Sequence, residues 1–222
     1  MSAFLGPIHH IMYGRIQLAA ARQQDLLDFV QQRLSPGQGE SLQAAWTLRH
    51  ALPAGELEEL IGDFPIHGWL QRQLEAQLES EAQLWALLAD RPERLRMVAT
   101  HLRQHGLRLG EALLSEDGGR ATDARRWLQA VDFSLLEGMP CDHLSQVVAA
   151  GEKAYIVRRD ILAHGRHWTR AGLAEDTALQ LHNAWMEGLM DALPSARFTR
   201  SEISVDGQRL FDDRLSLART EA

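Results

Sequence analysis

Histidines placed close after prolines are the residues of this chain whose types and spacing best suit chemistry. Pro7-Ile8-His9 and Pro65-Ile66-His67 share one pattern, and each begins a long amphipathic segment. Pro140-Cys141-Asp142-His143 again places a histidine shortly after a proline. Because proline is favoured in the first turn of a helix, we expect each segment to present a histidine at a helix N-terminus. The positive end of the helix dipole keeps such an imidazole neutral, able to bind a metal ion or to accept a proton.

A second histidine motif, His164-Gly165-Arg166-His167, follows a predicted strand. Its two histidines lie on one helical face or within one tight loop and can chelate a single ion. The preceding strand and Gly165 favour a strand-end loop, a common place for a functional site. Nitrogen ligands together with a possible thiolate favour zinc or iron over magnesium or calcium. The predicted metal ligands are His9, His67, His143, His164 and His167.

Further candidates lie beside these histidines. At a helix start, the thiolate of Cys141 would be stabilised as a soft ligand or a nucleophile, although a lone cysteine also serves as a small apolar residue. Asp142 and Glu137 are candidates for proton transfer, and Asp142 is equally suited to complement a helix dipole. The predicted catalytic residues are Glu137, Cys141 and Asp142, and the predicted ligand-binding residues are Tyr13, Trp69 and Trp168.

The apolar spacing shows which elements must position these side chains. Steps of three and four residues predict helices over residues 7–34, 41–50, 66–89, 93–105, 123–137, 141–150 and 173–193. Gly106 is expected to cap the fourth of these helices. Residues 154–161 have the β-branched and aromatic content of a strand, and Asp206-Gly207 predicts a hairpin between residues 197–205 and 209–217.

These elements predict a mainly α fold, in which an N-terminal helical bundle precedes an α+β part with a small antiparallel sheet of about three strands. The polar and glycine-rich residues 115–122 divide the helical part (1–115) from the α+β part (123–222). We expect the two parts to pack as one unit around a shared, mostly apolar cavity.

Composition limits the partners. The chain has 222 residues and a net charge of −7, which disfavours nucleic acid and anionic membranes as partners. Its single cysteine excludes an intrachain disulfide and fits a reducing compartment. The N-terminal residues show no basic and apolar signal pattern, so we expect a cytoplasmic protein.

From Glu137 onward, the order of elements resembles an α+β ligand-binding module. That module is shared by the 4-vinyl reductase-type domains and the L-2-amino-thiazoline-4-carboxylic acid hydrolase family. The resemblance depends on Trp168, on Trp185-Met186-Glu187-Gly188, and on the closing residues 198–201 and 206–212. Those families carry a cysteine shortly after the hairpin glycine, where this chain has Phe211. The resemblance implies a small-molecule site and, within the hydrolase family, cleavage of a C–N bond.

The sequence thus predicts a metal-binding enzyme that acts on a small molecule, with zinc or iron as cofactor. One alternative is a non-catalytic sensor that binds a small molecule or haem between histidines and tryptophans. Another is a helical interaction module that forms a homodimer through its long amphipathic helices.

Overall fold

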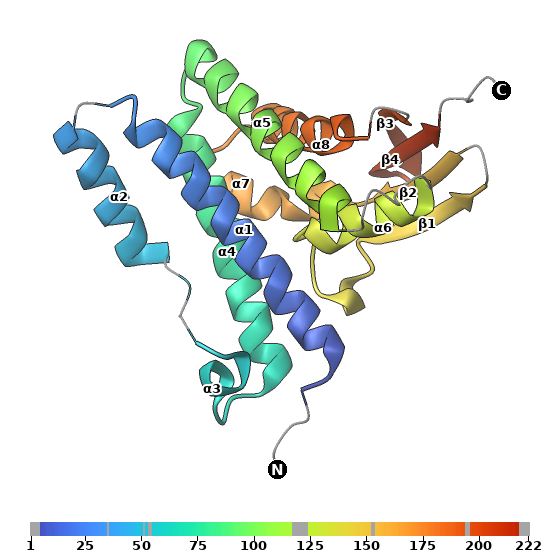
Figure 1. The fold of residues 1–222 in the computed structure, drawn as a ribbon, viewed down its shortest axis with the longest axis horizontal. Coiled ribbons are helices and arrows are strands. Elements are labelled where there is room, and N and C mark those ends of the chain that lie inside the picture. The colour runs from blue at the N-terminus through green and yellow to red at the C-terminus, as the bar shows by residue number, and fades with distance from the viewer. Residues whose placement is uncertain are drawn as a thin grey trace.

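The first half of the chain is helical, and the second half combines helices with an antiparallel sheet (Figure 1). The computed structural model describes residues 5–34, 36–50, 52, 55–116, 124–151, 154–193 and 196–217. The helical elements are α1 (Pro7–Gln31), α2 (Pro36–His50), α3 (Leu57–Ile61), α4 (Ile66–Leu88), α5 (Pro92–Glu116), α6 (Ala124–Ser134), η1 (Pro140–Asp142), η2 (Ile161–His164), α7 (Gly165–Ala171) and α8 (Glu175–Asp191). The strands are β1 (Ser145–Ala150), β2 (Ala154–Arg159), β3 (Ala196–Val205) and β4 (Gln208–Leu217). The mainly α fold with a small antiparallel sheet is confirmed.

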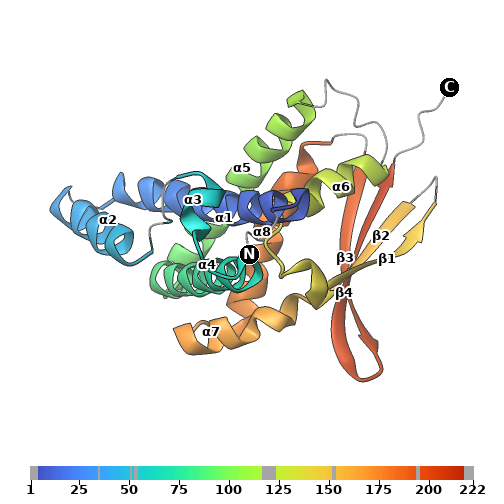
Figure 2. The same cartoon turned by 90° about the horizontal axis from the view of Figure 1, so that it is seen from below.

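The long helices α1 and α4 lie side by side and run in the same direction (Figures 1 and 2). The buried Gln23 amide of α1 donates to the Gln77 carbonyl of α4 at 3.1 Å. The preceding residue, Arg22, donates at 2.6 Å to Glu81, one turn beyond Gln77 in α4, and stacks over Trp185 of α8. Because the helices are parallel, both of their N-termini lie at the same end of the bundle.

Helix α5 packs closely against α8. A Cβ atom at Gly188 would lie 1.9 Å from the Arg103 carbonyl oxygen, and one at Gly106 would lie 2.2 Å from the Trp185 carbonyl oxygen. These glycines therefore let the two helix backbones approach each other. The predicted end of a helix at Gly106 is wrong: α5 continues to Glu116, and Gly106 is a contact within it.

The sheet has the strand order β1-β2-β4-β3, with every pair antiparallel. Within the described residues it contains four strands rather than about three. The additional strand is β1, where a helix over residues 141–150 was predicted. Leu144, Val147 and Val148 have helical spacing, but pairing with β2 outweighs this local pattern and the β-branched valines suit a strand.

The other main helices and the terminal hairpin agree with the periodicity. Helices α1, α4 and α8 lie within the predicted ranges, and β3 and β4 flank Asp206-Gly207. Most of the predicted linker, residues 117–122, lies outside the described residues.

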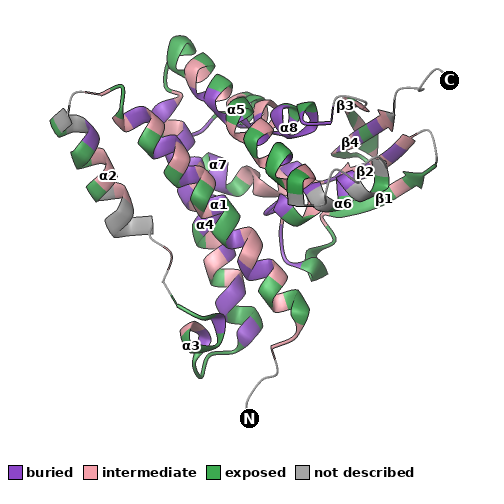
Figure 3. Ribbon diagram, in the orientation of Figure 1, coloured by how far each residue is buried: buried purple, intermediate pink, exposed green. Residues whose placement is uncertain are grey.

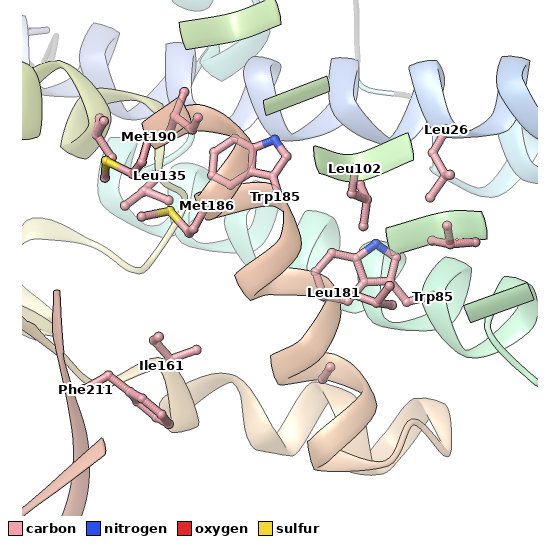
Figure 4. Packing of buried hydrophobic residues seen from close by; sticks show 14 of the residues in the cluster. Leu26, Trp85, Leu102, Leu135, Ile161, Leu181, Trp185, Met186, Met190 and Phe211 are labelled. Atoms are coloured by element: carbon pink, nitrogen blue, oxygen red, sulfur yellow. The ribbon is translucent and has the colours of Figure 1, made fainter. Parts of the chain in front are cut away.

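One large hydrophobic cluster joins both parts of the chain (Figure 4). Leu26 and Leu102 of the helical part belong to it together with Trp185 and Leu215 of the α+β part. A smaller cluster lies between α1, α3 and the first turns of α4, while the outer faces of the helices remain exposed (Figure 3). The two parts therefore fold around a common core. Within the described ranges, no helix is both long and apolar enough to cross a membrane.

Candidate functional site

The two Pro-Ile-His segments meet at the end of the bundle where α1 and α4 begin. His9 Nε2 lies 3.1 Å from His67 Nε2, and the ring centroids are 5.1 Å apart. The shared direction of the two helices brings these histidines together. This is the pairing on which the predicted metal site depends.

The hydrogen bonding of His9 determines what this pair can bind. The Gly6 amide donates to His9 Nδ1 at 3.0 Å, so the neutral ring carries its proton on Nε2. His9 Nε2–H then donates to His67 Nε2. A metal ion on His9 Nε2 would require a different tautomer and the loss of the Gly6 hydrogen bond. In this arrangement the two imidazoles are hydrogen-bonded to each other.

The Pro140 segment does not join the histidine pair. It forms the short η1 turn instead of a helix start, because His143 adopts a left-handed conformation with φ 52°. The Asp142 carboxylate accepts a hydrogen bond from the Met139 amide at 2.8 Å, and Cys141 and His143 are exposed. Asp142 therefore serves here as a cap of the turn.

The predicted aromatic residues are packed in the cores. Tyr13 and Trp69 are buried in the smaller cluster beneath the histidine pair, with ring centroids 5.7 Å apart. Trp168 is buried in the larger cluster, 6.5 Å from the His164 ring.

The two histidines of the His-x-x-His motif lie in a helical segment, not in the predicted loop, and they contact different groups. His164 Nε2 donates to the Glu137 carbonyl oxygen at 2.7 Å. His167 Nε2 lies 3.3 Å from the Glu75 carboxylate, and its buried Nδ1 has no hydrogen-bond partner among the described residues. Burial lowers the pKa of both rings, so each is held neutral. Across the described ranges, no group of three or more His, Cys, Asp or Glu side chains is arranged to hold a metal ion.

Glu137 belongs to a buried group of charges that we call the junction network, formed by Asp132, Glu137, Arg159, Arg200 and Asp213. Arg159 is fully buried and donates to Asp213 at 2.8 Å, to Glu137 at 2.8 Å and to Asp132. Arg200 donates to both oxygens of Asp213, at 2.5 Å to Oδ1 and at 2.7 Å to Oδ2, the oxygen that Arg159 also contacts. The network therefore joins α6 and the segment after it to three strands of the sheet, β2, β3 and β4.

Burial opposes the charges of Glu137 and Arg159. It raises the pKa of Glu137, against the attraction of Arg159. Burial would lower the pKa of Arg159, but the three carboxylates raise it above the ordinary arginine value. The Nδ1 atom of His182 lies 2.9 Å from Arg200 Nη1, and burial together with this guanidinium holds the pKa of His182 far below its usual value.

Apart from Glu137, the network was not predicted from the sequence, although a signal was present. Alternation along β2 places Arg159 on the same face as the buried Tyr155 and Val157. Asp213 likewise lies between the buried Phe211 and Leu215 of β4. A charged residue in the apolar register of a strand requires a partner, and this requirement predicts a buried ion pair.

An apolar groove lies on the outer face of α1, with a volume of about 520 Å³. Its lining residues are Ile11, Gly14, Arg15, Gln17, Leu18, Ala21 and Phe133. Arg15 is the one charged residue in this lining. A second groove, of about 690 Å³, lies between α5, α8 and β3 and contains residues from both parts of the chain. Neither groove is lined by a residue of the predicted site.

Comparisons with models of protein families, with curated protein sequences and with solved structures found no match for this chain. The resemblance of the α+β part to the reductase-type and hydrolase modules remains a prediction.

Proposed function

We propose that the protein binds a small amphiphilic anion in the groove on the outer face of α1. The apolar body of the ligand lies against Leu18 and Phe133, and its carboxylate or similar group binds Arg15. The groove has the volume of an ordinary small-molecule site. This proposal belongs to the sensor and ligand-binding class rather than to the metal enzymes.

The observation that carries the proposal is the unused hydrogen-bonding capacity of Arg15. Its buried Nε has no hydrogen-bond partner among the described residues. Among the described residues its Nη1 reaches only the Met12 sulfur, at 3.9 Å, and its guanidinium carbon lies 5.8 Å from the centre of the Phe133 ring. Sulfur is a weak acceptor, so this guanidinium is poorly solvated by the protein. An anionic ligand supplies acceptors to the part of the guanidinium that lines the groove.

The carboxylates of Glu137 and Asp132 lie near Arg15 and oppose the binding of an anion there unless one of them takes up a proton. Burial lowers the pKa of Arg15, and Glu137 and Asp132 oppose that effect without being hydrogen-bonded to it. Because the pKa of Glu137 is raised, this carboxylate takes up a proton more readily than an exposed one. A second anion beside Arg15 raises that pKa further, so binding is coupled to proton uptake at Glu137.

Isothermal titration calorimetry with decanoate as the probe tests this function. Arg15→Met removes the charge and keeps the apolar stem, and Arg72→Met is the matched control because Arg72 also stacks over an exposed phenylalanine, Phe64. A hydrogen bond to a charged group contributes about 1.5–3 kcal/mol, so Arg15→Met should weaken decanoate binding roughly ten- to hundredfold. The Arg72→Met variant should bind as the wild type does.

A second variant keeps the test independent of folding. Leu18 lies on the exposed wall of the groove, and Leu18→Glu should repel decanoate without altering the core. Octyl glucoside, a neutral amphiphile, should bind wild type and Arg15→Met equally. Absence of decanoate binding, or equal affinity of wild type and Arg15→Met for decanoate, would refute the proposal.

Metal-dependent hydrolysis remains a prediction from the sequence. His9 and His67 lie together, but the described residues add no third ligand to them. Metal analysis of the purified protein tests it, with His67→Ala and His164→Ala as variants expected to lose the ion.

A further inference from the structure

The groove on α1 lies next to the junction network. Phe133 lines the groove, and its ring centre is 5.8 Å from the guanidinium carbon of Arg15. Asp132 precedes this phenylalanine in the chain and Glu137 follows it by four residues. The charges of both carboxylates act on Arg15. An anion that binds Arg15 from the groove therefore also meets two carboxylates.

The charges at this junction balance without a ligand. Three guanidinium groups face three carboxylates, namely Arg15, Arg159 and Arg200 with Asp132, Glu137 and Asp213. The adjoining His164 and His182 are neutral, because burial lowers the pKa of each ring. The next charged pair, Arg22 with Glu81, is balanced in itself. Among the described residues, an added anion thus has no spare positive charge to compensate it, and burying an uncompensated charge is costly.

A proton restores this balance. Carboxyl groups that crowd one site share protons, because like charges close together are not all ionised at once. A ligand with a carboxyl group adds a further place for that proton. A sulfonate or sulfate ester does not, so the proton must go to Asp132 or Glu137, and both are already hydrogen-bonded as carboxylates to Arg159.

We propose that the α1 groove takes carboxylic acids, each together with one proton, and discriminates against sulfonates and sulfate esters of similar chain length. This inference rests on the function proposed above and narrows the class of ligand. One oxygen of the ligand accepts a hydrogen bond from Arg15. The proton belongs jointly to the carboxyl groups of the ligand, Asp132 and Glu137. Binding therefore adds no net charge to the junction.

Calorimetry of the full chain with decanoate counts the protons when it is repeated in buffers of different ionisation enthalpy. A free carboxyl group titrates near about pH 4, so decanoate is ionised at neutral pH and the proton comes from the solvent. We expect uptake of about one proton per decanoate and a rise in Kd of about tenfold per pH unit between about pH 6.5 and 8. Decanesulfonate should bind the wild type at least about tenfold more weakly than decanoate at about pH 6.5.

Asp132→Asn tests the charge balance directly. It removes one negative charge from a side chain that is 30% exposed, and the amide oxygen still accepts from Arg159. The junction then has a spare positive charge, so decanesulfonate should bind at least about tenfold more tightly than it binds the wild type. Proton uptake with decanoate should fall toward zero. Because misfolding does not create affinity, this gain of binding is a readout that a folding defect cannot imitate.

Asp212→Asn is the matched control. Asp212 pairs with Arg158 on the outer face of the sheet, outside the junction network, and its replacement should leave decanesulfonate binding and proton uptake unchanged. Decanoate binding without proton uptake, or equal affinity of the wild type for decanoate and decanesulfonate, would overturn this inference and leave the ligand site in the groove intact. Unchanged decanesulfonate binding in Asp132→Asn would overturn it as well. Absence of decanoate binding at every pH would instead refute the site in the groove, and this inference with it.

Discussion

Replacing Arg159 by methionine tests whether the junction network stabilises the fold. Arg159 is fully buried and is the common donor to Asp132, Glu137 and Asp213. Methionine fills a similar volume, so the change removes the charge and its hydrogen bonds without leaving a large cavity. The carboxylates then lose their shared partner.

The size of the effect follows from how buried each carboxylate is. Asp213 is fully buried but retains Arg200, whereas Glu137 and Asp132 are 18% and 30% exposed. Removing one partner of a buried ion pair costs about 3–5 kcal/mol. Because Asp213 keeps one guanidinium and Asp132 reaches water, we expect a loss near the lower figure, about 3 kcal/mol. This is a large share of the roughly 5–15 kcal/mol that stabilises an ordinary domain.

The neighbouring residue provides a matched control. Arg158 pairs with Asp212 at 2.8 Å on the outer face of the same two strands, where both side chains are partly exposed. Arg158→Met should cost no more than about 1 kcal/mol. Urea unfolding followed by circular dichroism measures both free energies of unfolding. Equal losses in the two variants would show that burial does not set the contribution of these ion pairs.

Two further predictions concern α5 and α8. Trp185 donates its indole N–H to His105 Nδ1 at 3.0 Å, and burial lowers the pKa of His105 to about 4. Since an unfolded histidine titrates near pH 6.5, the stability from neutral His105 is present above that pH and is lost as pH falls through about 4. His105→Gln, whose amide oxygen still accepts from the indole, should therefore show a smaller fall in Tm between about pH 7 and pH 4 in calorimetry, and an equal fall would contradict this. Gly188→Ala brings a Cβ to 1.9 Å from an α5 backbone oxygen and should cost about 3 kcal/mol or more in urea unfolding. Gly165→Ala, with no atom within 4 Å, should change stability by less than about 1 kcal/mol, and similar losses in the two variants would refute the close-contact argument.

The elements set by local signals were predictable from the sequence. The apolar periodicity of α1, α4 and α8 and the Asp206-Gly207 turn each depend on residues near one another in the chain. Strand β1, in contrast, forms because β2 pairs with it, whereas the spacing of its own apolar residues is typical of a helix. The continuity of α5 through Gly106 depends on its contact with α8, which no local pattern reveals.

The same distinction between local signals and contacts with other elements applies to the candidate site. His9 and His67 could be paired in advance because each begins a long helix and parallel helices bring their N-termini together. The separation of His164 from His167 could not, because their partners, the Glu137 carbonyl and Glu75, come from other elements. The alternation in β2 and β4 marked Arg159 and Asp213 as charges on an apolar face, but their pairing requires the register of the sheet.

That register and the junction network specify each other. Slipping β2 by one residue against β4 would turn Arg159 to the opposite face of the sheet, away from Asp213. In the native register Arg159 lies opposite Phe211, two residues from Asp213, so a slip of two residues toward Arg209 would keep the face but move the guanidinium about 7 Å further from Asp213, beyond hydrogen-bond reach. Either slip leaves Asp213 buried with one guanidinium instead of two and separates Arg159 from its partner on β4. Burying charges costs about as much free energy as pairing them recovers. The network therefore raises the free energy of unfolding little above what apolar side chains in the same place would give. Its effect is to raise the free energy of these slipped registers relative to the native pairing of the two strands.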